Sequence, residues 1–181
     1  AESTVHKHFG KGKKYLSLQL GYGEGFSPHF TAQGDGRKVR YLYVFPGFGV
    51  GISDVKGENK WYRGNFDLLA GGVFIRNFEP SDGFSAGVNF LIRYNFLRWQ
   101  RFVPFVEAGA GIGYLDFDLE DQEDGLIFYP QVGMGLHYFL INRLSADISL
   151  CLYHMSNAGT NMPNDGINSG LVLLGFTYYL D

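Results

Sequence analysis

A histidine and a serine two positions apart near the C-terminus are the residues best suited to catalysis. If they lie on a β-strand, His154 and Ser156 share one face, because alternate side chains of a strand point to the same side. At this spacing a histidine nitrogen can reach the serine hydroxyl, which is the pairing that activates a serine nucleophile. The alternative is that the strand has already ended and both residues begin a loop.

The neighbouring residues supply two further groups of catalytic interest. Asn157, Ala158 and Gly159 follow directly, and they offer a polar side chain and unhindered backbone N–H groups that could stabilise an oxyanion. Asn168 stands at the start of the final predicted strand and has the same even-numbered parity as His154. We therefore expect Asn168 to converge with the histidine and the serine on one outer surface patch.

In the segments that must position these residues, apolar and polar side chains alternate with a period of two residues, which is typical of β-strands. The clearest segment is 84–96, where one face is apolar at every second position. Its length matches the roughly 9 to 11 residues of a tilted strand that crosses a bilayer. In all, the alternation predicts eight strands, at about 14–22, 39–52, 65–74, 84–96, 102–114, 128–140, 144–152 and 172–180.

Polar and charged residues of these strands fall on the face opposite the apolar one: Gln19, Asp67, Arg93, Glu107, His137 and Asp147. Eight strands enclose a lumen just wide enough for side chains to fill. The large apolar set therefore fits better outside, in lipid. We predict an all-β fold, an eight-stranded antiparallel transmembrane β-barrel of the outer membrane, with a polar, hydrogen-bonded interior.

The connections suggest which end of the barrel is which. Those after the fourth and sixth strands are short, whereas those after the first, third, fifth and seventh are expected to be longer and to lie outside the cell. Residues 53–60 are an exception, being a longish connection on the periplasmic side. We expect one domain over residues 1–181, with residues 1–13 as a solvated periplasmic tail that contains His6 and His8.

Composition narrows the classes of function. The 15 Lys and Arg residues against 18 Asp and Glu residues give a net charge of −3, without the basic stripe of a nucleic-acid-binding protein. The single Cys151 excludes an intramolecular disulfide and a cysteine zinc cluster. The Ala-Glu-Ser start is typical of a chain whose signal peptide has been removed, although a recombinant product would look the same.

Two short runs resemble the C-terminal signature of a known family. Residues 154–159, His-Met-Ser-Asn-Ala-Gly, are followed at 163–167 by Pro-Asn-Asp-Gly-Ile. This pattern resembles the PagL family of lipid A 3-O-deacylases, acyloxyacyl hydrolase-like barrels of the outer membrane whose active site faces the lipid. The close match is confined to this C-terminal part. Elsewhere only the barrel pattern and the length agree.

The resemblance implies a serine esterase that removes the ester-linked 3-O-hydroxyacyl chain from lipid A of lipopolysaccharide. It makes Ser156 the nucleophile, His154 the general base, and Asn157 with the backbone around Gly159 the oxyanion donors. It implies no metal and no other cofactor. The partners that it implies are lipopolysaccharide and outer-membrane lipid.

One position departs from the family pattern. The family's third catalytic member is a Glu, and Asn168 stands in its place. In a serine protease the change of the triad acid to its amide lowers kcat by roughly 10⁴, yet papain-like enzymes use an Asn. Asp165 is a substitute acid if its loop folds back. We predict a slow or conditional deacylase, and Asn168→Glu should raise its rate.

Two alternatives stay open at this point. A catalytically silent barrel could use the same surface to bind lipid A or another envelope protein, and Asn168 favours this reading. A soluble lipocalin-like carrier would instead line a cavity with the apolar residues, and it would need no detergent. The sequence does not distinguish a monomer from a homodimer.

Overall fold

A computed structural model of the chain describes residues 5–26 and 39–180. These residues form a single turn of 3-10 helix, η1 (His6–His8), and long antiparallel strands. The strands are β1 (Lys14–Gly25), β2 (Arg40–Gly51), β3 (Gly64–Glu79), β4 (Gly83–Phe96), β5 (Phe102–Asp116), β6 (Gly125–Phe128), β7 (Gln131–Ile141), β8 (Leu144–Met155) and β9 (Ile167–Tyr179).

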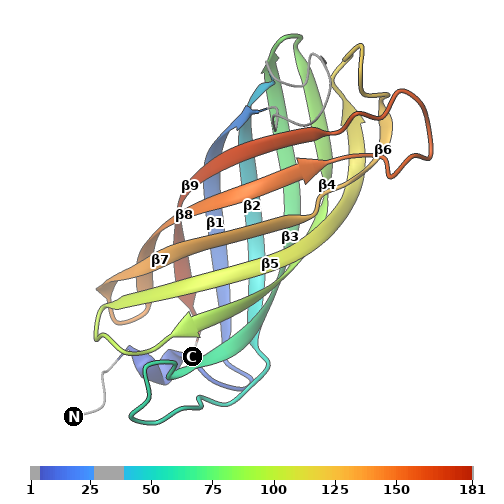
Figure 1. Cartoon of the computed structure of the whole chain (residues 1–181). Coiled ribbons are helices and arrows are strands. Elements are labelled where there is room, and N and C mark those ends of the chain that lie inside the picture. The colour runs from blue at the N-terminus through green and yellow to red at the C-terminus, as the bar shows by residue number, and fades with distance from the viewer. Residues whose placement is uncertain (1–4, 27–38, 181) are drawn as a thin grey trace.

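The strands close into an antiparallel barrel with eight positions around its wall (Figure 1). β1 pairs with β9, and β4 pairs with β5, so the sheet has no free edge. The short β6 and the longer β7 both pair with β5 and together occupy one position. They are separated at Pro130, which has no N–H to donate to the ladder. The predicted eight-stranded transmembrane barrel is confirmed.

The outer face carries the apolar residues, as the alternation predicts. Leu150 is 56% exposed and Phe90 is 54% exposed, whereas their neighbours in the chain point inward. The barrel strands, 16 residues long in β3, can cross a hydrocarbon layer about 30 Å thick. Across residues 5–26 and 39–180, no helix has the length and apolar character needed to span a bilayer.

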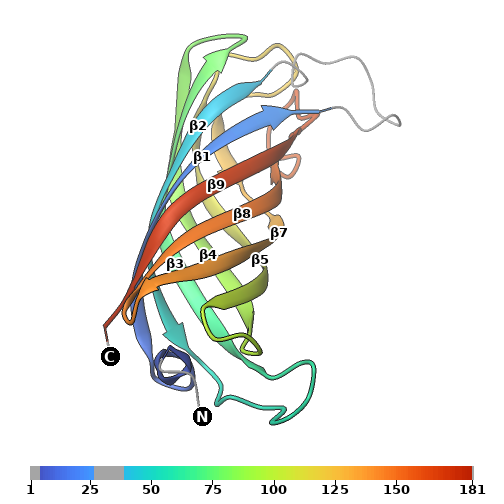
Figure 2. The same ribbon diagram turned by 90° about the vertical axis from the view of Figure 1, so that its left-hand side faces the viewer.

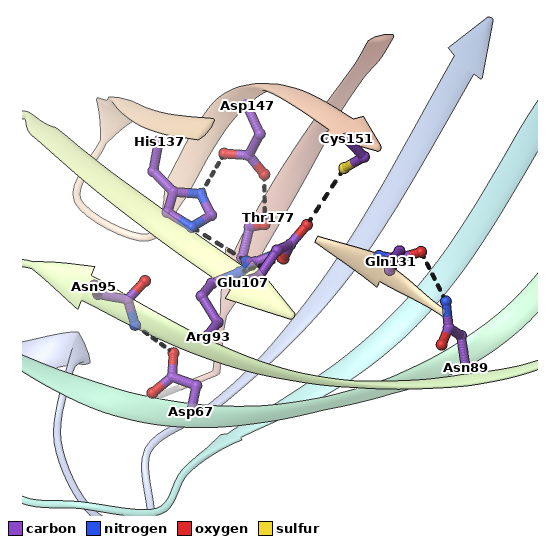
Figure 3. Close-up of polar contacts among 10 residues, drawn as sticks. All are labelled: Asp67, Asn89, Arg93, Asn95, Glu107, Gln131, His137, Asp147, Cys151 and Thr177. Atoms are coloured by element: carbon purple, nitrogen blue, oxygen red, sulfur yellow. Dashed lines mark hydrogen bonds and ion pairs between the residues drawn. The ribbon is translucent and has the colours of Figure 1, made fainter. Parts of the chain in front are cut away.

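The interior is polar at its centre, where a network of ionised and hydrogen-bonded side chains crosses the lumen (Figure 3). The Arg93 guanidinium donates two hydrogen bonds to Glu107 Oε2, at 3.0 and 2.8 Å, and one to His137 Nε2 at 3.3 Å. His137 Nδ1 donates to Asp147 Oδ1 at 2.6 Å, and Thr177 donates to the other oxygen of Asp147. The predicted hydrogen-bonded interior is therefore confirmed.

Aromatic residues fill the lumen on the outer side of this network. Tyr129 and Tyr153 are buried and stack with their ring centroids 5.8 Å apart. The Tyr129 hydroxyl also hydrogen-bonds Ser85 Oγ at 2.6 Å. Because Tyr153 directly precedes His154 in β8, this packing fixes the inner side of the strand that carries the candidate site.

The segment before β1 differs from the expected solvated tail. His6 and His8 are buried, with 8% and 2% of their surface exposed, and η1 lies across the lower mouth of the barrel (Figure 2). His6 Nε2 donates to Trp99 O at 2.9 Å, and Phe9 packs edge-on against Phe139. The expectation of a solvated tail is wrong for residues 5–10, all of which are buried except the exposed Lys7. Phe9 covers the aromatic residues Phe139 and Tyr179 at this mouth.

The connections have the predicted relative lengths except in one case. Those between β5 and β6 and between β8 and β9 are long and lie at the end opposite the chain termini (Figure 1). The connection after β3 was expected to be long, but it has only residues 80–82, because the alternation continues to Glu79. The connection between β1 and β2 lies largely outside the described residues.

Candidate active site

The pairing of β8 with β9 brings His154 opposite Asn168. His154 Nδ1 lies 2.8 Å from Asn168 Oδ1, and since a carbonyl oxygen only accepts, Nδ1 carries the hydrogen. Nε2 then keeps its lone pair and can take a proton. The expected proximity of these two residues is confirmed, and β8 extends past His154, so this histidine does not begin a loop.

Ser156 lies just beyond β8 and is held by a bridge to Phe128 of β6. Its N–H donates to Phe128 O at 3.2 Å, and its carbonyl accepts from Phe128 N–H at 2.8 Å. His154 and Ser156 are both half-buried. Within the described residues no hydrogen bond joins Ser156 Oγ to His154, which is common in active sites without substrate.

The turn after Ser156 is organised by Asn157, which is only 2% exposed. Asn157 Nδ2 donates to Asn161 O at 2.9 Å, and Asn157 Oδ1 accepts from Gly159 N–H at 2.9 Å. Both predicted oxyanion donors are therefore engaged inside the turn. Ala158 is exposed, has a φ of 55°, and its N–H makes no hydrogen bond to any described residue.

Asp165 does not take the place of an acid next to the histidine. It is exposed, and its backbone N–H donates to Asp121 O at 3.0 Å. Among the residues that the structure describes, none with a charge hydrogen-bonds the His154 ring. Asn168, not Asp165, is the residue that the fold brings to the imidazole.

Two residues to which the sequence assigned no role in the site also contact this region. Gly166 lies against the His154 ring, and its N–H donates to Gln122 Oε1 at 3.2 Å. Gln122 belongs to the connection between β5 and β6, far from His154 in the sequence. The connection that contains Gln122 is too short to show a hydrophobic alternation, so nothing in the sequence marks this residue.

A groove of about 830 Å³ runs over the outer surface of the barrel from β5 to β1. Leu152 and Gly170 line it, and each is two residues from a member of the His154–Asn168 pair on the same strand face. Gly170 leaves open space where another residue would place a side chain. The candidate site therefore adjoins an apolar groove on the surface that faces lipid.

Metal-binding geometry is absent from the described part of the chain. Over residues 5–26 and 39–180, no group of three or more His, Cys, Asp or Glu side chains could hold a metal ion. The groups that gather at the end of β8 are a hydroxyl, an imidazole and a carboxamide.

Comparison with solved structures finds the same barrel in several proteins. The outer-membrane enzyme PagL superposes with a TM-score of 0.60 at 21% identity, over 89% of this chain and 97% of that one. Neisserial surface protein A gives 0.64 at 12% identity, over 91% and 96%. The Yersinia pestis attachment invasion locus protein Ail gives 0.55 at 16%, over 94% and 99%. At these identities the likeness concerns the fold.

Sequence comparison is more specific. No curated protein matches the chain. The family model described as lipid A 3-O-deacylase (PagL) matches residues 57–177, which include six of the barrel strands in full and the whole candidate site. The chain therefore belongs to the PagL family of lipid A 3-O-deacylases and is a β-barrel of the bacterial outer membrane.

Proposed function

We propose that this chain is a serine esterase that removes the 3-O-hydroxyacyl chain from lipid A in the outer leaflet. The observation that carries the proposal is the 2.8 Å contact between His154 Nδ1 and Asn168 Oδ1. His154 is in β8, and Ser156 follows it by two residues, just beyond the end of that strand. The contact leaves the histidine in the tautomer that a serine nucleophile requires.

In the proposed reaction, Ser156 Oγ attacks the ester carbonyl while His154 Nε2 takes the hydroxyl proton. The carbonyl oxygen becomes an oxyanion, and His154 then returns the proton to the departing sugar oxygen, leaving an acyl-enzyme. A water molecule attacks this acyl-enzyme, again with His154 as base, and releases the hydroxy fatty acid and free Ser156.

The turn at 157–159 is the proposed source of the oxyanion donors. Ala158 N–H is available without any rearrangement, since it has no hydrogen-bond partner among the described residues. Asn157 Nδ2 and Gly159 N–H join it when they exchange their bonds within the turn for the oxyanion. Removing a single donor of this kind lowers kcat by roughly 10²- to 10³-fold in a serine protease.

The apolar groove gives the acyl chain a place to lie. In the bilayer the substrate's acyl chains run beside the barrel wall, and the groove passes Leu152 and Gly170 next to the site. A chain seated there would bring its ester bond toward Ser156. Holding the ester bond close to Ser156 in a fixed orientation makes the reaction step effectively unimolecular, which raises its rate.

The experiment that tests this function is incubation of the detergent-purified protein with lipopolysaccharide, followed by mass spectrometry of the lipid A. We expect loss of one hydroxyacyl chain with the wild type and none with Ser156→Ala. Ser53→Ala is a matched control, because Ser53 lies in the connection between β2 and β3 at the other end of the barrel. Equal loss with Ser156→Ala would refute the serine mechanism.

A second candidate is a catalytically silent barrel that binds lipid A on the same surface. Asn168 favours it, because an amide cannot balance the positive imidazolium that forms during the reaction as a carboxylate does. This candidate predicts that the folded, heat-modifiable barrel retains lipopolysaccharide without changing its mass. Detectable release of hydroxy fatty acid would rule it out.

A further inference from the structure

The connection between β5 and β6 is tied to the connection that follows Ser156. Glu123 N–H donates to Pro163 O at 2.8 Å, and Asp165 N–H donates to Asp121 O at 3.0 Å. A bridge between Gln122 and Asn164 lies between these two bonds. The two connections therefore form one backbone-paired unit at the outer end of the barrel (Figure 1).

Gln122 is the side chain that joins this unit to the backbone beside the site. It is only 1% exposed, and a buried carboxamide has to be hydrogen-bonded on both of its polar atoms. Its Oε1 accepts from Gly166 N–H at 3.2 Å, while its Nε2 donates to Glu123 O at 3.1 Å. The Gly166 backbone is thus held by a side chain of the connection between β5 and β6.

Gly166 in turn lies against the edge of the His154 ring. A Cβ atom at position 166 would be 2.7 Å from His154 Cε1 and 3.3 Å from His154 Nε2, so any other residue there would have to displace the ring. Its φ of +73° also lies in the left-handed region that favours glycine. The imidazole is consequently bonded to Asn168 at Nδ1 and lies against Gly166 at its Cε1–Nε2 edge.

We propose that Gln122 is a positioning residue for His154 and acts through Gly166. This inference rests on the proposed function, because it assigns Gln122 to the same histidine. A neutral carboxamide holds an imidazole less strongly than a carboxylate, since charge-assisted hydrogen bonds are about twice as strong as neutral ones. Gly166 restricts rotation of the ring and so limits the directions in which Nε2 can point.

The kinetic test compares Gln122→Ala with Gln122→Glu on lipopolysaccharide. Gln122→Ala should lower kcat by roughly 10- to 100-fold with little change in KM, because a displacement of about 1 Å can cost 10²-fold. Gln122→Glu keeps an oxygen that accepts from Gly166 N–H, so it should recover most of the rate. Gln131→Ala is the matched control, because Gln131 is a buried glutamine that accepts from Asn89 Nδ2 inside the lumen.

A second readout does not depend on turnover. In nuclear magnetic resonance spectra, the His154 Nδ1–H should give a sharp downfield signal, identified by its loss in His154→Gln. We expect Gln122→Ala to broaden or move this signal and Gln131→Ala to leave it unchanged. An unaltered signal in Gln122→Ala overturns the inference. If the wild type has no activity, the proposed function fails, and the ring signal still decides the role of Gln122.

Discussion

Replacement of Asn168 by Asp tests how much the neutral orienter limits the chemistry. Asp has the size and shape of Asn, so it should place a carboxylate oxygen at the 2.8 Å position that Asn168 Oδ1 now occupies. The tautomer of His154 is already suitable, and the variant therefore changes only the charge that faces the imidazolium in the transition state. The rate should rise.

The size of the gain follows from the geometry. Two unit charges about 4 Å apart near a protein surface attract by roughly 4 kcal/mol at an effective dielectric constant of 20, before any desolvation cost. Because the pair is half-buried, the desolvation cost of the two charges offsets part of this attraction. About 1 to 3 kcal/mol of transition-state stabilisation remains. At about 1.4 kcal/mol for each factor of ten, kcat should increase by roughly 5- to 150-fold.

The assay is initial-rate release of hydroxy fatty acid from lipopolysaccharide in detergent, with heat-modifiable gel mobility as the check on folding. Asn164→Asp is the control, because it adds the same charge to the neighbouring turn while keeping an oxygen that accepts from Asn157 N–H. Asn168→Glu should act in the same direction if its longer side chain is accommodated. An unchanged or lower rate in folded Asn168→Asp would refute the reasoning.

Two further predictions concern the groove and the lumen. Gly170→Leu should fill the groove and shift the substrate preference toward shorter acyl chains, measured as kcat/KM on esters of graded acyl length. Ala110→Leu, on β5, is the control and should leave this preference unchanged. An unaltered preference in Gly170→Leu would exclude the groove as the acyl site. Glu107→Ala should lower the free energy of unfolding in detergent by about 3 to 5 kcal/mol, because it leaves the buried Arg93 guanidinium without its ion-pair partner. The double variant Glu107→Ala/Arg93→Met should recover much of this loss. Equal losses in the single and double variants would contradict the prediction.

The sequence was informative where the structure is repetitive. The alternation that runs through 84–96 and the other segments predicted the barrel and the outward side of each strand, because a one-residue change of register would turn every apolar side chain inward. The same parity predicted that His154 and Asn168 lie on one face. Their adjacency then needed only the antiparallel pairing of the last two strands.

Other features depend on contacts between distant segments that have no periodic signature. The burial of His6 and His8 results from contacts with distant parts of the chain, such as the bond from His6 to Trp99 O in the connection between β4 and β5. The turn bonds of Asn157 could not be anticipated either, because they depend on the backbone path of the loop. The contact from Gln122 to Gly166 spans 44 positions of the chain.

The most direct test of the central claim, that Ser156 is a nucleophile activated by His154 on the lipid-facing surface, is covalent labelling with an alkyl fluorophosphonate. Peptide mass spectrometry should find one phosphonyl group on Ser156 of the wild type, with strongly reduced labelling in His154→Gln. Labelling that is equally fast in folded His154→Gln, or a folded wild-type barrel that gains no phosphonyl group on Ser156, would contradict the account.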